Sequence, residues 1–126
     1  MKRLALVLLS LLLLTLPGGA FAAAGPWSKA GAVEARLVAA VEGTGDLARV
    51  PLALEVRLEP GWKTYWRTPG DAGLPPRLAW DGSANLKEAV LAYPAPHRFT
   101  TLGIETVGYD REVTFPIVAI PAEPGR

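Results

Sequence analysis

Apolar and polar residues alternate along most of the chain, with the period of two that a half-buried β-strand requires. The clearest case runs from Arg49 to Glu59. Its alternate apolar residues, which would share one face, are Val50, Leu52, Leu54, Val56 and Leu58. Pro51 lies on the polar face and has no N–H to donate, which is typical of an edge strand or a strand start. This segment is therefore predicted to be a strand.

The segment from Val33 to Val41 alternates in the same way, with Glu34, Arg36 and Glu42 on the polar side. Its alanine and glutamate content also suits an amphipathic helix, which is the competing interpretation. The run Gly43-Thr44-Gly45-Asp46 follows and is predicted to be a turn. We expect a strand over residues 33–41.

Further short segments show strand patterns between proline and glycine breakers. They are residues 62–67, 77–81, 86–93 and 112–120. Residues 97–110 are predicted to be a long connection, with weak strand character at 104–107. Six or seven short strands without a convincing helix indicate an all-β, immunoglobulin-like antiparallel β-sandwich that lacks its last one or two strands.

The N-terminus has the features of a cleavable signal peptide over residues 1–22. Two basic residues precede the apolar run Leu4–Leu16, and Ala20-Phe21-Ala22 supplies small residues at the cleavage site. Cleavage is expected before Ala23, or before Gly25 at an alternative site. A membrane anchor is the other interpretation, but a spanning helix needs about 20 apolar residues. We expect export to the periplasm, with residues 23–126 forming one domain.

Composition narrows the function classes. Without the signal peptide, the 13 basic residues fall by two to 11 against 12 acidic residues, a net charge of −1. A nearly neutral chain with dispersed charges offers no electrostatic basis for binding nucleic acid or an anionic membrane. We therefore expect no nucleic-acid partner.

The chain has no cysteine. It can form no disulfide and no Cys-His catalytic pair, and a serine triad would need His97 with Ser28 or Ser83. With one histidine and no cysteine, the composition also argues against a metal site. No catalytic residue, metal ligand or cofactor is predicted.

Residues 60–76 hold three aromatic residues within five positions, followed by a loop rich in proline and glycine. Alternation would place Trp62, Thr64 and Trp66 on one face of this segment. The other face would carry Lys63, Tyr65 and Arg67, a phenol and two cations beside the loop. We expect Trp62, Trp66 and, farther along, Trp80 to pack in the core.

Together with Trp80, Tyr93–Phe99 and Gly108–Val113, this aromatic block resembles the N-terminal periplasmic domain of DsbD/ScsB-type thiol:disulfide interchange proteins. The resemblance covers nearly the whole chain after the signal peptide. It implies an immunoglobulin-like domain that receives electrons from a membrane-embedded domain. The electrons would then pass to periplasmic thiol oxidoreductases by disulfide exchange, without a small-molecule cofactor.

In that family the two reactive cysteines lie in a strand pair just after the segment matching Glu112–Ile120. We therefore expect the 126 residues to be a fragment that holds the scaffold and the cap loop. The family is a protein-disulfide reductase family, but exchange requires a thiolate, so this chain cannot perform it alone. The alternative is a non-catalytic periplasmic β-sandwich module that binds protein or carbohydrate.

The resemblance also implies two site residues, Phe99 and Tyr65, and His97 is a third candidate on its own chemistry. Residues 96–103 are similar to the loop that caps the reactive cysteines, and Phe99 matches its covering aromatic. Tyr65 matches an aromatic that lines the same site. His97 is either a proton relay near the thiols or a solvated loop residue. Without the resemblance, Phe99 would be read as an ordinary aromatic on the rim of the sandwich.

Overall fold

The computed structural model describes residues 23–126, so the signal-peptide prediction lies outside the described residues. Residues 23–126 form nine strands: β1 (Ala23–Ala24), β2 (Ser28–Ala30), β3 (Val33–Ala39), β4 (Val50–Leu58), β5 (Lys63–Gly70), β6 (Leu86–Leu91), β7 (His97–Thr101), β8 (Ile104–Asp110) and β9 (Glu112–Pro121). In this part of the chain, no helix has the length and apolar character needed to cross a bilayer. The all-β prediction is confirmed.

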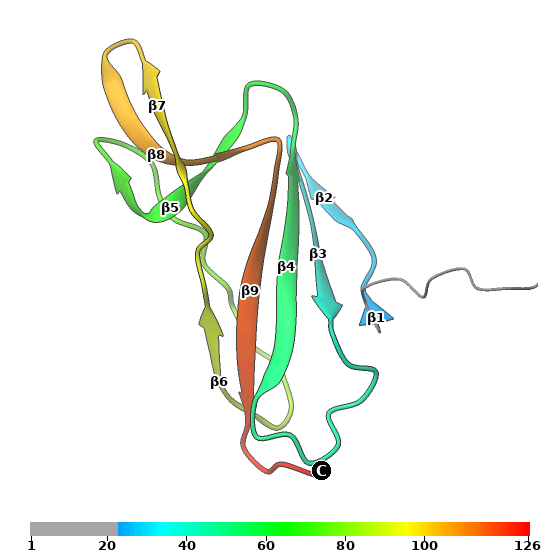
Figure 1. Ribbon diagram of the computed structural model, residues 1–126. Helices are drawn as coiled ribbons and strands as arrows, with labels where there is room; N and C mark the ends of the chain where they lie inside the picture. The colour runs from blue at the N-terminus through cyan, green and yellow to red at the C-terminus, as the bar shows by residue number, and fades with distance from the viewer. Residues whose placement is uncertain (1–22) are drawn as a thin grey trace, which may run out of the picture.

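Most strands belong to a six-stranded antiparallel sheet, in the order β1-β3-β4-β9-β6 with β2 also paired to β3 (Figure 1). The register aligns Leu54 of β4 with Leu37 of β3 and with Phe115 of β9. Apolar positions of successive strands thus share one face, which we call the inner face. The helix interpretation of residues 33–42 is wrong, because the alternating side chains of β3 complete this face.

The remaining strands form a three-stranded sheet in the order β5-β8-β7, at the upper end of the larger sheet in Figure 1. The prediction of a long connection over residues 97–110 is wrong, because they form the β7–β8 hairpin. Its two-residue turn has positive φ at Leu102 (51°) and Gly103 (78°), the conformation of a type I′ turn. Leucine is atypical at the first position, so the turn was not recognisable from the sequence.

The predicted strand at residues 77–81 is also absent from the described structure. These residues belong to the connection between β5 and β6 and pair with no strand. Pro76 offers no N–H, and its carbonyl instead accepts a hydrogen bond from the Tyr93 hydroxyl at 3.5 Å. Leu78 and Trp80 are half-buried, so their apolar character reflects packing of an irregular segment.

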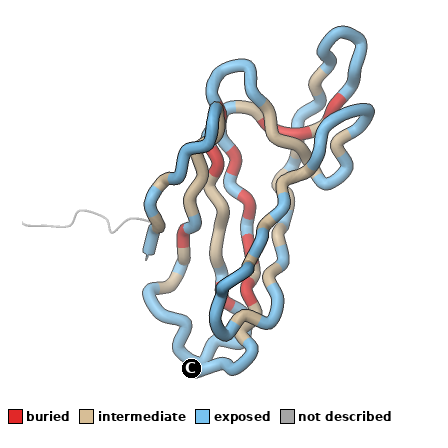
Figure 2. Tube along the Cα trace, turned by 180° about the vertical axis from the view of Figure 1, so that it is seen from behind, coloured by how far each residue is buried: buried red, intermediate tan, exposed pale blue. Residues whose placement is uncertain are grey.

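The core lies where the two sheets meet. Its buried members are Val56, Leu58, Tyr109, Val113 and Phe115. The ring of Phe115 is fully buried and contacts Tyr93 and Tyr109 edge to face, with ring centroids 5.7 and 5.2 Å away. The buried positions recur at every second residue of β9, visible as red bands in Figure 2. The strand prediction for residues 112–120 is confirmed.

The strand order matches an immunoglobulin sandwich. Strands β3, β4, β9 and β6 lie in the order A-B-E-D of that fold, and β5, between β4 and β6 in sequence, crosses to the second sheet as strand C does. The smaller sheet covers one end of the inner face, where Trp66 and Tyr109 pack on the core. Away from that end the face is more open, since Leu37 is 41% exposed and Leu52 is half-buried.

Candidate functional site

The structure brings Tyr65, His97 and Phe99 to one face of the three-stranded sheet. Tyr65 of β5 and His97 of β7 both pair with Gly108 of β8, so their side chains lie on the same side of one row. Phe99, two residues after His97, shares that side. We call this surface the hairpin face; the same registers assign to it Lys63, Tyr65, His97, Phe99, Thr101, Ile104, Thr106, Gly108 and Asp110.

Lys63 holds the hairpin face together across three strands. Its ammonium nitrogen lies 4.7 Å from the centroid of the Phe99 ring and donates a hydrogen bond to Thr101 Oγ1 at 3.2 Å. The rings of His97 and Phe99 meet at 68°, with centroids 6.4 Å apart. A cation–π contact at such an exposed site contributes about 0.5–1 kcal/mol. Contacts with other side chains of the hairpin face therefore position Phe99, and packing in the core does not.

Two glycines allow Tyr65 to lie where it does. A Cβ on Gly108 would collide with the Thr64 carbonyl oxygen and stand 2.8 Å from Tyr65 Cα. A Cβ on Gly73, whose φ is +99°, would stand 2.6 Å from Tyr65 Cε1. The Tyr65 side chain is thus confined between β8 and the loop after β5. Sequence reasoning missed both contacts, although a glycine inside a strand often marks close approach of another backbone.

Two hollows adjoin the hairpin face, and the first lies at its edge, because Arg98 and Glu105 of the opposite face also line it. One, of about 290 Å³, is lined by Phe99 together with Asp71, Arg98 and Glu105. The other, of about 430 Å³, runs past Tyr65 to the tip of the hairpin. Thr106 lines both hollows and is 8% exposed. Tyr65 and Phe99 are half-buried and His97 is exposed, so the rings can cover a group seated against them.

The opposite face of this sheet is structural. Tyr109 packs in the core, and its hydroxyl donates a hydrogen bond to the Pro94 carbonyl at 2.8 Å, which fixes the chain entering the hairpin. Burial raises the pKa of Tyr109, the nearby Tyr93 raises it further, and Arg67 opposes the shift. Arg67 lies 4.8 Å over the Trp66 ring, in the part of β5 where the pairing with β8 shifts register between Tyr65 and Gly70.

The tryptophans divide between two environments. Trp66 packs against the core, as predicted, and Trp80 is half-buried. The core prediction for Trp62 is wrong, because this side chain is 58% exposed. Trp62 precedes β5 in a tight turn, where its N–H bonds the Glu59 carbonyl at 3.0 Å. Its ring therefore stands beside the hairpin tip and not between the sheets.

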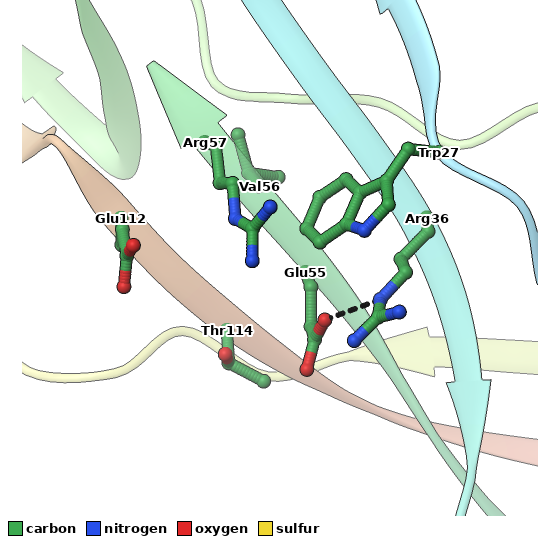
Figure 3. A pocket seen from close by; sticks show the side chains of 7 residues that line it. All are labelled: Trp27, Arg36, Glu55, Val56, Arg57, Glu112 and Thr114. Atoms are coloured by element: carbon green, nitrogen blue, oxygen red, sulfur yellow. Dashed lines mark hydrogen bonds and ion pairs between the residues drawn. The ribbon is translucent and has the colours of Figure 1, made fainter. Parts of the chain in front are cut away.

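A further hollow of about 130 Å³ lies on the outer face of the larger sheet, around Trp27 (Figure 3). The guanidinium carbons of Arg36 and Arg57 lie 4.6 and 4.0 Å from the Trp27 ring centroid. Arg36 also donates to Glu55 at 2.6 Å. Because Trp27 connects β1 to β2, this stack fastens the N-terminal strands to the sheet. We regard it as a structural contact.

The side chains that could bind a metal ion lie apart from one another in the described residues. Within residues 23–126, no three His, Asp or Glu side chains come together as metal ligands. The hairpin face offers aromatic rings, hydroxyls, the Lys63 ammonium group and the Asp110 carboxylate, and sulfur packs favourably against aromatic rings. Its arrangement therefore suits covering a reactive group better than carrying one.

Comparison with known proteins gives two matches. The family model for the N-terminal part of thiol:disulfide interchange protein DsbD matches residues 33–125. The chain is also similar to the crystal structure of the N-terminal periplasmic domain of ScsB from Proteus mirabilis, with 35% sequence identity and a TM-score of 0.65. That similarity covers 78% of this chain and 39% of the other, so the chain spans about two-fifths of that structure. A search of curated protein sequences returns no match.

Proposed function

Because this chain belongs to the family of DsbD N-terminal domains, we propose that it supplies the scaffold and the shielding face of a periplasmic thiol:disulfide interchange domain. The complete domain would receive electrons from a membrane-embedded donor and pass them to periplasmic thiol oxidoreductases. Residues 23–126 would hold the fold and cover the reactive pair.

The chemistry requires sulfur that these residues do not contain. In exchange, a thiolate attacks a partner disulfide, a mixed disulfide forms, and the partner's other sulfur leaves as a thiolate. A second thiolate then attacks the mixed disulfide, so that two electrons pass to the partner. Because the 126 residues include no cysteine, the dithiol must come from another segment or another polypeptide.

The observation that carries the proposal is the convergence of Tyr65 and Phe99 on the hairpin face. Between Tyr65 and His97 the row contains only Gly108, which adds no side chain to the surface. A sulfur pair seated here would be covered by aromatic rings and kept from solvent oxidants. Exposure of the pair would require the hairpin to move.

The hairpin is suited to such a movement. Strand β7 pairs only with β8 among the described strands, and of its five residues only Phe99 is even half-buried. Segments with few buried contacts open at low free-energy cost compared with the core. The contact between Lys63 and Phe99 would hold the closed state, at the modest strength expected of an exposed cation–π pair.

A binding module without catalysis is the second candidate, and the exposed Trp62 favours it. Indoles that stack on sugars need polar neighbours to bind the hydroxyl groups. The groove beside Trp62 also holds the apolar side chains of Leu102 and Ile104, and the Lys63 ammonium there already contacts Phe99 and Thr101. If the module only binds, its surface fits a protein better than a carbohydrate.

The two candidate functions differ in whether the native protein should contain reactive thiols. We propose isolating the native protein from the periplasm in which it is made, together with any polypeptide that co-purifies. The thiols of each component are then titrated after denaturation. The interchange function predicts a cysteine pair that a chromogenic disulfide reagent oxidises rapidly before denaturation. A preparation without titratable thiol in any component would leave only the binding module.

A further inference from the structure

The chain that follows β5 folds back over the ring of Tyr65. A Cβ added to Gly73 would stand 2.6 Å from Cε1 of that ring and 2.7 Å from both Cδ1 and Cζ. Because three successive ring atoms are almost equally distant, Gly73 lies over the flat face of the ring and not at its edge. Its φ of +99° is a conformation that glycine adopts without strain and other residues do not. A glycine at position 73 therefore permits this stack.

The start of the same loop is held against β8. The pairing of β5 with β8 runs regularly as far as Tyr65 and Gly108, then shifts register and resumes at Gly70 and Thr106. A Cβ added to Gly70 would stand 2.8 Å from the Glu105 carbonyl oxygen. A larger residue at position 70 would therefore keep β5 from returning to β8.

Asp71 fastens the loop to both backbone groups of Glu105. Its N–H donates to the Glu105 carbonyl at 2.9 Å, and its carboxylate oxygen Oδ2 accepts from the Glu105 N–H at 3.4 Å. Since the two residues are 34 positions apart in sequence, this pair ties the loop to a distant part of the chain. The loop at residues 70–73 is thus fixed at one end by β8 and covers Tyr65 at the other.

The two aromatic residues of the hairpin face are held by different contacts. Phe99 is held within its own face, by the Lys63 ammonium and the His97 ring. Tyr65 is held by the loop, whose next residue, Ala72, lines the same groove as Tyr65. The two rings can therefore be released independently of each other.

We propose that the loop at residues 70–73 positions the Tyr65 ring as one wall of the thiol cover, with Gly73 and Asp71 as its positioning residues. This inference rests on the proposed interchange function and adds an element that regulates it. The loop sets how readily the thiols are reached past Tyr65, whereas the β7–β8 hairpin sets how readily they are reached past Phe99. Neither positioning residue takes part in the bond changes.

The test measures alkylation of the reduced native protein by iodoacetamide. Gly73→Ala should speed alkylation about fivefold, because the added methyl group displaces the ring and the covered state is populated less. Gly82→Ala is the matched control, since Gly82 also has a positive φ, +79°, but no atom lies within 4 Å of its added Cβ. Both variants strain the backbone, and only the first meets Tyr65, so Gly82→Ala should leave the rate unchanged.

Double variants test whether the loop acts through Tyr65. In a Tyr65→Leu background, Gly73→Ala should add nothing to the alkylation rate. In a Phe99→Ala background it should still speed alkylation about fivefold, because the two rings are held independently.

Asp71 is tested by removing and restoring its acceptor oxygen. Asp71→Ala should speed alkylation about threefold, a smaller effect because the shorter backbone bond to Glu105 remains. Asp71→Asn should restore most of the slow rate, since its amide oxygen can accept from the Glu105 N–H.

Equal rates for Gly73→Ala and Gly82→Ala would overturn the positioning role, as would an effect of Gly73→Ala that persists in Tyr65→Leu. An unchanged rate in Asp71→Ala would remove Asp71 from it. Failure of the interchange function is recognised separately, because the wild type would then offer no reactive thiol to iodoacetamide. The stack itself is still measurable in that case, since the ring current of Tyr65 should shift the NMR signals of the Gly73 α protons upfield in the wild type and not in Tyr65→Leu.

Discussion

Two antiparallel strand pairs of this protein use their apolar residues in opposite ways. In β4 and β9 the alternate residues Val56, Val113 and Phe115 face the core and are less than 9% exposed. In the β7–β8 hairpin, Leu102 and Ile104 face solvent. The pairing geometry is the same, so the difference lies in what covers each face. The first pair stabilises the fold, whereas the second presents a surface.

The same substitution in both regions should give unequal losses of stability. Phe115→Ala should lower the free energy of unfolding by about 3–5 kcal/mol, because it leaves a cavity between two tyrosine rings. Phe99→Ala on the half-buried hairpin should cost about 1 kcal/mol, mainly the contact with Lys63. Urea denaturation of both variants measures the difference. Similar losses would contradict the division into a core pair and a surface pair.

A smaller loss is expected where two neighbouring strands of the smaller sheet, β5 and β8, depend on a glycine. Gly108→Ala should destabilise the protein by about 1–3 kcal/mol, because its Cβ would meet the backbone of Thr64 and Tyr65. Faster amide hydrogen exchange should follow in β5 and β8. Gly43→Ala is the matched control, since no atom lies within 4 Å of its added Cβ. Equal effects of the two alanines would show that β5 and β8 do not approach as closely as described.

Sequence patterns predicted the core pair and missed the surface pair, for a physical reason. Alternation identifies a strand only when one face is buried, as in β9. The hairpin has no such contrast, and its turn uses Leu102 where Asn or Gly would have marked a type I′ turn. Trp62 was assigned to the core because of its size, yet a turn before β5 directs it outward.

The candidate site was accessible to sequence reasoning only in part. Family resemblance supplied Tyr65 and Phe99, and side-chain chemistry supplied His97, but their position on one face follows from the pairing of β5 and β7 with β8. That register depends on long-range pairing, which no local pattern encodes. Arg67, which strict alternation would place with Lys63, instead stacks on Trp66 in the irregular part of β5.

The smallest expected effect is on the pH dependence of stability and concerns Tyr109, which lies in β8 and packs against Phe115 of β9. Burial raises the pKa of Tyr109 above its ordinary value, so the fold favours the neutral phenol. This stabilisation is complete below the unfolded pKa of about 10 and is lost as pH rises through the folded pKa. Tyr109→Phe should therefore show a weaker fall in stability above about pH 10, besides losing a hydrogen bond worth about 0.5–1.5 kcal/mol. Urea midpoints measured across this range test it, and parallel curves for the two proteins would refute the assignment.

The most direct test of the account is the alkylation rate of the reactive thiols in the reduced native protein, with and without Phe99. If the hairpin face covers a dithiol, Phe99→Ala should speed alkylation by iodoacetamide about tenfold, because the covered state is populated less. Thr100→Ala, an exposed residue on the opposite face of the same strand, should leave the rate unchanged. Equal rates for the wild type and Phe99→Ala would contradict the shielding role of this face.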